Sequence, residues 1–196
     1  MSGFKCIFNR FTVGSYPING YLLADPETRI GVFIDPGGFN ESIAEMISSR
    51  NIELRIIFFT HGHWDHVEGL PEFMRRYSVR CYAGKNEVKA ANNILQGGET
   101  LDVGKLRFQA FSTPGHSPGA ISYYASELEM LFPGDALFCG SMGGTENAEN
   151  EQLQTEQVCC HLFTLPDQTR VFPGHGPVTT IAAEKYANPF FQADDP

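Results

Sequence analysis

Four side chains that commonly bind metal ions fall within the six residues from His61 to His66. The segment reads T-H-G-H-W-D-H over residues 60–66 and directly follows the apolar run 56–59. Imidazole nitrogens and carboxylate oxygens are donors that suit zinc, iron or manganese. Crowded together without an ion, these groups would repel one another or lose hydration, and a cation removes both costs. The spacing therefore predicts a metal site at the tip of a buried strand.

Three further residues extend this candidate site. The chain has six histidines, and His116 and His175 lie in Gly/Pro-rich turns with the sequences T-P-G-H-S-P-G and P-G-H-G-P. A rigid turn just beyond a strand can aim an imidazole in one direction, as a metal site requires. Asp135 follows the apolar residues 130–132 and a Pro-Gly turn, so it is a further candidate. His161 follows two cysteines in an expected helix, where packing or solvent exposure is the simpler interpretation.

The order of these motifs resembles the metallo-β-lactamase superfamily: H-x-H-x-D-H, a His after T-P-G, an Asp in G-D and a His in P-G-H-G. Within it, the chain is most similar to the hydroxyacylglutathione hydrolases (glyoxalase II) and their short, single-domain relatives. The resemblance extends from Asn19 to Phe190. It implies an α/β fold, the four-layer αββα sandwich, with ligands on loops along one edge of two facing sheets. Residues 1–196 are then expected to form one metallohydrolase domain.

The resemblance also implies two divalent metal ions, with zinc as the first expectation and iron or manganese as alternatives. One ion would be held by His61, His63 and His116, the second by Asp65, His66 and His175, and Asp135 would bridge them. Asp35, which follows the apolar residues 31–34, matches a carboxylate near the centre in this family. We expect it to orient a ligand or its loop, and a simple turn-forming role is the alternative.

The activity implied by the resemblance is hydrolysis of a thioester or related acyl compound, with a small molecule as substrate. A hydroxide that bridges the two ions would attack the carbonyl carbon, and Asp65 would act as the catalytic residue that aims it. The main alternative is a mononuclear iron persulfide dioxygenase, because such enzymes have the same motif set. Lactonases, phosphodiesterases and β-lactamases rank lower. A β-lactamase would normally lack the carboxylate of Asp135, and a non-catalytic metal-binding domain would not need all seven ligands.

Three features separate the chain from the full-length hydroxyacylglutathione hydrolases. Gly144 stands where those enzymes carry a basic residue, Pro177 replaces an aromatic residue, and the sequence ends at Pro196 without their C-terminal helical domain. A glutathione carboxylate would lose charge-assisted partners that contribute about 1.5–3 kcal/mol each. The glutamates of residues 140–157 would either disfavour anionic substrates or form a solvated loop and helix start. Glutathione recognition therefore does not follow from the metal motifs.

The amino-acid composition and net charge indicate which kinds of binding partner to expect. The chain has 196 residues, 42% of them hydrophobic, and a net charge of -9, which disfavours nucleic acid as a partner. We see no signal peptide and no apolar run of membrane-spanning length. Five cysteines without a C-x-x-C pair favour free thiols and a cytoplasmic location. The sequence leaves the oligomeric state open.

The elements that must position these residues alternate along both halves of the chain. Apolar residues at three- and four-residue spacing predict a helix over residues 41–49, and one apolar face predicts another over residues 67–77. Further helices are expected over residues 86–95, 151–162 and 180–186. Apolar runs predict strands over residues 6–8, 21–23, 31–34, 54–59, 79–82, 106–111, 120–124, 130–132 and 170–172. This alternation predicts an α/β domain without fixing its topology.

Overall fold

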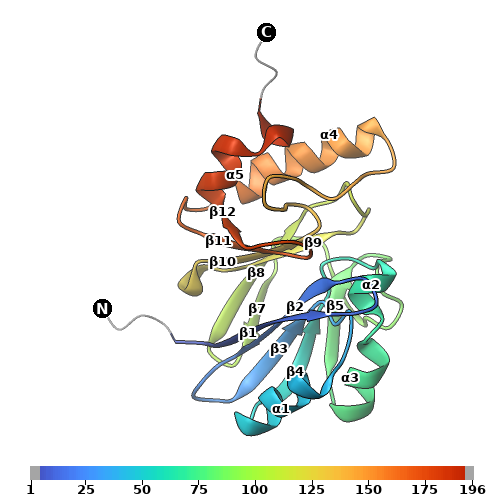
Figure 1. Cartoon of the computed structure of the whole chain (residues 1–196), viewed down its shortest axis with the longest axis vertical. Coiled ribbons are helices and arrows are strands. Elements are labelled where there is room, and N and C mark those ends of the chain that lie inside the picture. The colour runs from blue at the N-terminus through green and yellow to red at the C-terminus, as the bar shows by residue number, and fades with distance from the viewer. Residues whose placement is uncertain (1–4, 193–196) are drawn as a thin grey trace.

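The computed structural model describes residues 5–192 as two six-stranded sheets that face each other, with helices on their outer sides (Figure 1). The first sheet has the order β1-β2-β3-β4-β5-β6 and the second the order β12-β11-β10-β9-β8-β7. The strands of the first sheet are β1 (Ile7–Val13), β2 (Ile18–Ala24), β3 (Ile30–Ile34), β4 (Glu53–Phe58), β5 (Arg80–Gly84) and β6 (Asn93–Leu95). Those of the second are β7 (Thr100–Val103), β8 (Leu106–Ser112), β9 (Ile121–Ala125), β10 (Met130–Gly134), β11 (Arg170–Pro173) and β12 (Thr179–Thr180).

Helices cover the outer face of each sheet. In Figure 1, α4 and α5 lie above one sheet, and α1 and α3 lie below the other. The α-helices are α1 (Glu41–Ser49), α2 (Trp64–Val67), α3 (Leu70–Arg76), α4 (Ala148–Gln157) and α5 (Ile181–Ala187). The shorter helical segments are η1 (Ser126–Leu128), η2 (Val158–Leu162, a π-helix that continues α4) and η3 (Pro189–Phe191).

Three apolar layers hold these elements together. The layer between the sheets contains aromatic side chains from both, including Phe58 and Tyr123, whose stacked ring centroids are 4.5 Å apart. A second layer lies between the first sheet and helices α1 and α3, where Ile43 and Phe73 are fully buried. A third lies between the second sheet and the α4–η2 and α5 helices, where Leu162 is fully buried. Three apolar layers separate four structural layers, which confirms the predicted αββα sandwich.

Most predicted elements are present, but one helix was predicted wrongly. Residues 86–95 form turns and the short strand β6 instead of a helix. Asn86 has a left-handed φ of 65°, which ends regular structure after β5, and the Asn93 side chain donates to the Cys81 carbonyl across to that strand. The helix expected over residues 67–77 is present as α3, and residues 64–67 before it form the separate short helix α2. Pro71 lies in the first turn of α3, where its missing N–H is not needed.

The topology brings strand ends to one shared edge. Strands β3, β4 and β5 run parallel, as do β10 and β11. Asp35 follows β3, the 60–66 motif follows β4, Asp135 follows β10 and His175 lies two residues beyond β11, while His116 lies in the β8–β9 turn. Since the carboxyl ends of parallel strands meet at the same edge of a sheet, these residues converge between the two sheets. Nowhere in residues 5–192 is there a helix long and apolar enough to cross a membrane.

Candidate metal centre

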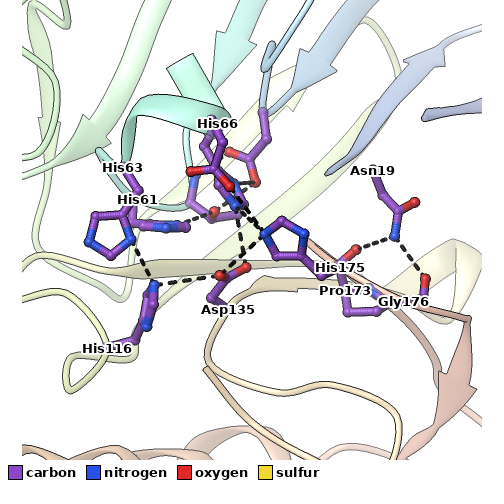
Figure 2. Close-up of polar contacts among 12 residues, drawn as sticks. Asn19, His61, His63, His66, His116, Asp135, Pro173, His175 and Gly176 are labelled. Carbon is purple, nitrogen blue, oxygen red and sulfur yellow. Dashed lines mark hydrogen bonds and ion pairs between the residues drawn. The ribbon is translucent and has the colours of Figure 1, made fainter. Parts of the chain in front are cut away.

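All seven predicted ligands lie at this edge, in three groups that share members. In each group the ligand atoms lie within 4.8 Å of one another, and the groups are His61-His63-His116, His61-His66-Asp135 and Asp65-His66-His175. Figure 2 shows the imidazoles pointing toward one another around Asp135. Because neighbouring groups share His61 or His66, the seven side chains form one continuous centre.

The local backbone explains how one short motif supplies both ends of this centre. The chain is extended through His63, which caps α2, and the first helical turn then carries Asp65 and His66. His61 and His63 therefore join the group with His116, whereas Asp65 and His66 join the group with His175. A change from extended to helical backbone within the motif divides its four candidate ligands between two groups.

Buried Asp35 and Thr60 orient two of the histidines. Asp35 Oδ1 accepts from the Thr60 amide at 2.7 Å, and Oδ2 accepts from the Thr60 hydroxyl at 2.7 Å and from His66 Nδ1 at 3.0 Å. Because the Thr60 hydroxyl donates to Asp35, its oxygen can accept from His61 Nδ1, 3.1 Å away. These partners assign the proton of each ring to Nδ1. His61 and His66 therefore both present Nε2 to the centre.

Backbone carbonyls orient two further histidines, His116 and His175. His116 Nδ1 lies 2.6 Å from the carbonyl oxygen of Gly144, and His175 Nδ1 lies 3.0 Å from that of Pro17. A carbonyl oxygen can only accept, so each Nδ1 must donate and each Nε2 faces the centre as an acceptor. The turn that carries His175 is itself held by buried Asn19, whose side chain donates to two carbonyls of that turn (Figure 2).

These orientations fit a cation. His66 Nε2 and His175 Nε2 are 3.4 Å apart, so a proton or a metal ion must lie between two nitrogens that would otherwise repel. His61 Nε2 and Asp135 Oδ1 are buried without a hydrogen-bond partner. Leaving buried polar atoms unpaired costs free energy unless an ion satisfies them. The residues present therefore suit one or more divalent metal ions.

Asp135 has the central position. Its carboxylate oxygens lie 3.3 Å from His66 Nε2, 3.5 Å from His116 Nε2 and 3.6 Å from His175 Nε2. Gly174 packs directly against it, because a Cβ there would lie 2.3 Å from Asp135 Oδ1. Asp65 reaches the centre from the other side, with Oδ2 3.3 Å from His175 Nε2. Asp135 therefore contacts both the three-histidine group and the group that contains Asp65.

The pKa values of the neighbouring histidines His61 and His66 are shifted in opposite directions. Burial, and then the nearby imidazole of His66, lower the pKa of His61 well below its usual value. Burial also disfavours the charged form of His66, but Asp35 and Asp135 outweigh it and raise the pKa of His66 to about 10. Burial would raise the pKa of Asp135, yet the neighbouring imidazole of His66 holds it well below its ordinary range. Negative charge is thus concentrated where His66 lies.

Some residues at the site were not predicted from the sequence, and one histidine stays outside it. Thr60 could have been recognised as a hydroxyl directly before the first ligand, whereas Phe138, 5.9 Å from the His175 ring between centroids, carries no local signal. His161 stacks on Phe111 and belongs to none of the ligand groups in residues 5–192. This agrees with its interpretation as a packing or surface residue.

Comparisons with known proteins identify the family. A model of the metallo-beta-lactamase superfamily matches residues 13–175. The probable metallo-hydrolase YqgX of Bacillus subtilis is 31% identical, covering 93% of this chain and 96% of that protein. The hydroxyacylglutathione hydrolase GloC of Haemophilus influenzae is 28% identical, covering 92% of this chain and 96% of that protein.

Solved structures have the same fold. The B3 metallo-beta-lactamase BLEG-1 superposes with a TM-score of 0.87 at 29% identity, covering 95% of this chain and all (100%) of that one. ETHE1 from Myxococcus xanthus superposes with a TM-score of 0.85 at 33% identity, covering 93% of this chain and 83% of that one. TTHA1623, in a di-iron-bound form, superposes with a TM-score of 0.77 at 28% identity, covering 93% of this chain and 99% of that one. The chain belongs to the metallo-β-lactamase superfamily, whose members are mostly hydrolases, and it carries that family's cluster of metal-binding side chains.

Proposed function

We propose that the protein hydrolyses thioesters or related acyl compounds and uses two divalent metal ions to do so. The observation that carries this proposal is the position of Asp135, within 3.6 Å of imidazoles from both sides of the centre. A carboxylate between two ligand groups can bridge ions about 3.5–4 Å apart, the separation typical of two-metal hydrolytic sites. The similarity to a hydroxyacylglutathione hydrolase and to a protein with a di-iron-bound form supports this choice.

The proposed ligand atoms follow from the ring orientations. His61 Nε2, His63 Nδ1 and His116 Nε2 would hold one ion, Asp65, His66 Nε2 and His175 Nε2 would hold the second, and Asp135 would contact both. When bound, such ions lower the pKa of water to about 7 and polarise an acyl carbonyl. Zinc is the metal we propose first, because it suits nitrogen and oxygen donors at hydrolytic sites, and iron suits the same set.

The residues around the ligands have distinct roles in this scheme. Asp65 is the catalytic residue, because its carboxylate can accept a hydrogen bond from the attacking water and keep it aimed. Asp35 and Thr60 fix the directions of His66 and His61, so that little reorientation is needed when substrate binds. Each role depends on a carboxylate or hydroxyl held by hydrogen bonds already made in the folded protein.

The proposed substrate is a small molecule that need not be a glutathione thioester. Gly144 offers the site its carbonyl oxygen and no side chain, and a Cβ there would meet no atom within 4 Å. The net charge of -9 supports a small-molecule substrate over nucleic acid. All five cysteines lie within the described residues as free thiols, which supports a cytoplasmic location.

Thiol release from a panel of thioesters tests this function. Protein loaded with zinc, iron or manganese should release thiol from at least one thioester, S-lactoylglutathione included, and metal-free protein should release none. Oxygen uptake with glutathione persulfide should be measured on the same preparations. Oxygen uptake without any thioester hydrolysis would overturn the proposal and favour the dioxygenase.

A further inference from the structure

Glu87 lies outside the ligand groups, in the turns that follow β5, and its half-buried carboxylate accepts three hydrogen bonds. Oε2 accepts from the Gly62 amide at 2.8 Å, and Oε1 accepts from the Gly119 amide at 2.6 Å and from the Ser117 hydroxyl. Charge-assisted hydrogen bonds of this kind are about twice as strong as neutral ones. One carboxylate therefore joins two chain segments that are otherwise far apart in the sequence.

The two segments joined by Glu87 carry the whole three-histidine group. Gly62 stands between His61 and His63, and Ser117 directly follows His116. The backbones also touch, because a Cβ at Gly62 would lie 2.1 Å from the Glu87 carbonyl oxygen. This close contact brings the Gly62 amide within reach of the carboxylate.

The other half of the centre has different supports. His66 is held by Asp35, and His175 by the Pro17 carbonyl, with Asn19 fixing its turn. None of these contacts involves Glu87, whose side-chain hydrogen-bond partners in the described chain are all in the segments of the three-histidine group. Loss of the Glu87 contacts should therefore affect one metal position and leave the other intact.

We propose that Glu87 is a positioning residue that assembles His61, His63 and His116 into a metal site before any ion binds. The proposal rests on the metal centre proposed above and adds a residue with a selective effect on one half of it. Loops lose conformational freedom when they are fixed, and a ligand set that is already fixed binds its ion more tightly. Glu87 supplies that fixation by satisfying donors on both loops with one side chain.

Glu87→Gln tests the proposal with little change in size. An amide keeps one acceptor oxygen, but its NH₂ group must face either the Gly62 amide or the Ser117 and Gly119 donors, so one link is lost. Metal-free protein would be titrated with Co²⁺, with its absorption spectrum and chelator competition reporting the affinity of each position. We expect two bound ions in the wild type. In the variant, the three-histidine position should weaken by about 10- to 100-fold while the other is unchanged.

Glu99→Gln is the matched control. Glu99 is also half-buried and accepts two backbone amides, from Gln96 at 2.7 Å and Gly97 at 2.9 Å, in the turn between β6 and β7. This variant should bind both Co²⁺ ions as the wild type does. Ser117→Ala removes one of the three bonds to Glu87, so it should weaken the same position as Glu87→Gln by a smaller factor.

The outcomes separate this proposal from the proposed function. Wild-type affinity for both ions in Glu87→Gln would overturn the role of Glu87 and leave the metal centre standing. Equal weakening of both positions in Glu87→Gln, with a lowered unfolding temperature, would also overturn it, because the role proposed is selective. A wild-type protein that binds no Co²⁺ would overturn both proposals.

Discussion

The two halves of the centre are built from the same kinds of ligand but are supported in opposite ways. In the three-histidine group, His63 is exposed and His116 half-buried, and surface loops held by Glu87 bring them together. In the other half, His66 is fully buried and hydrogen-bonded to the buried carboxylate of Asp35. The three-histidine half therefore depends on contacts between loops, whereas the position of His66 in the other half depends on the buried carboxylate of Asp35.

Asp135→Ala should have the largest effect, because it removes a carboxylate that lies beside imidazoles of both halves. It also leaves buried His66 without one of its two carboxylate partners. We expect kcat/KM for thioester hydrolysis to fall by more than about 10³-fold, equivalent to roughly 4 kcal/mol. Elemental analysis of the purified variant should find less than the wild-type metal content. Two tightly bound ions and normal turnover would refute the bridging position.

Removal of metal should destabilise the folded protein as well as abolish turnover. An ion present at about 100 times its Kd stabilises the native state by about 2.7 kcal/mol. For a chain of this length we expect Tm to fall by about 5–10 °C after chelation. Thermal unfolding with and without chelator measures the shift, and re-addition of zinc, iron or manganese in parallel identifies the ion that restores both stability and activity. Full activity of metal-free protein would contradict the whole scheme.

Asp35→Asn should act mainly on the half that Glu87→Gln spares, because Asp35 contacts His66 directly and reaches His61 only through Thr60. Asp35 has a left-handed φ of 52°, a conformation that asparagine tolerates, so the fold should survive the exchange. The amide cannot accept from both Thr60 donors and from His66 at once, and the charge beside His66 is lost. We expect metal affinity at the Asp65-His66-His175 position to fall by about 10- to 100-fold. Cobalt titration of both variants should give complementary losses, and loss at the same position in both would break the comparison.

Gly144→Lys should have the smallest effect and concerns substrate instead of metal. Residue 144 is exposed beside His116, and a Cβ there meets no atom within 4 Å, so a side chain can be added without a clash. A lysine ammonium near the three-histidine side should lower KM for anionic thioesters by about five-fold, which corresponds to the interaction free energy of one exposed ion pair. Gly144→Met is the uncharged control of similar length. Equal KM changes for neutral and anionic substrates, or in both variants, would argue against an electrostatic cause.

Local pattern was enough to indicate the candidate ligands and most of the elements. The 60–66 motif, the two Gly/Pro turns with His116 and His175, and Asp135 after an apolar run all carry their signal within a few residues. Hydrophobic spacing likewise predicted α1 and β4, where one buried face repeats along the segment. It was wrong for residues 86–95, because apolar spacing cannot reveal that the chain turns there.

The supports of the centre were decided by the tertiary structure. Asp35 lies 31 residues from His66, and Glu87 lies 25 from Gly62 and 32 from Gly119, so no local spacing relates them. Parallel pairing of β3, β4 and β5 is what brings the ends of these strands to one edge. The sequence by itself determined which side chains could bind metal. Strand pairing decided which carboxylates hold them in place, because a hydrogen bond needs an approach that only the packed sheets create.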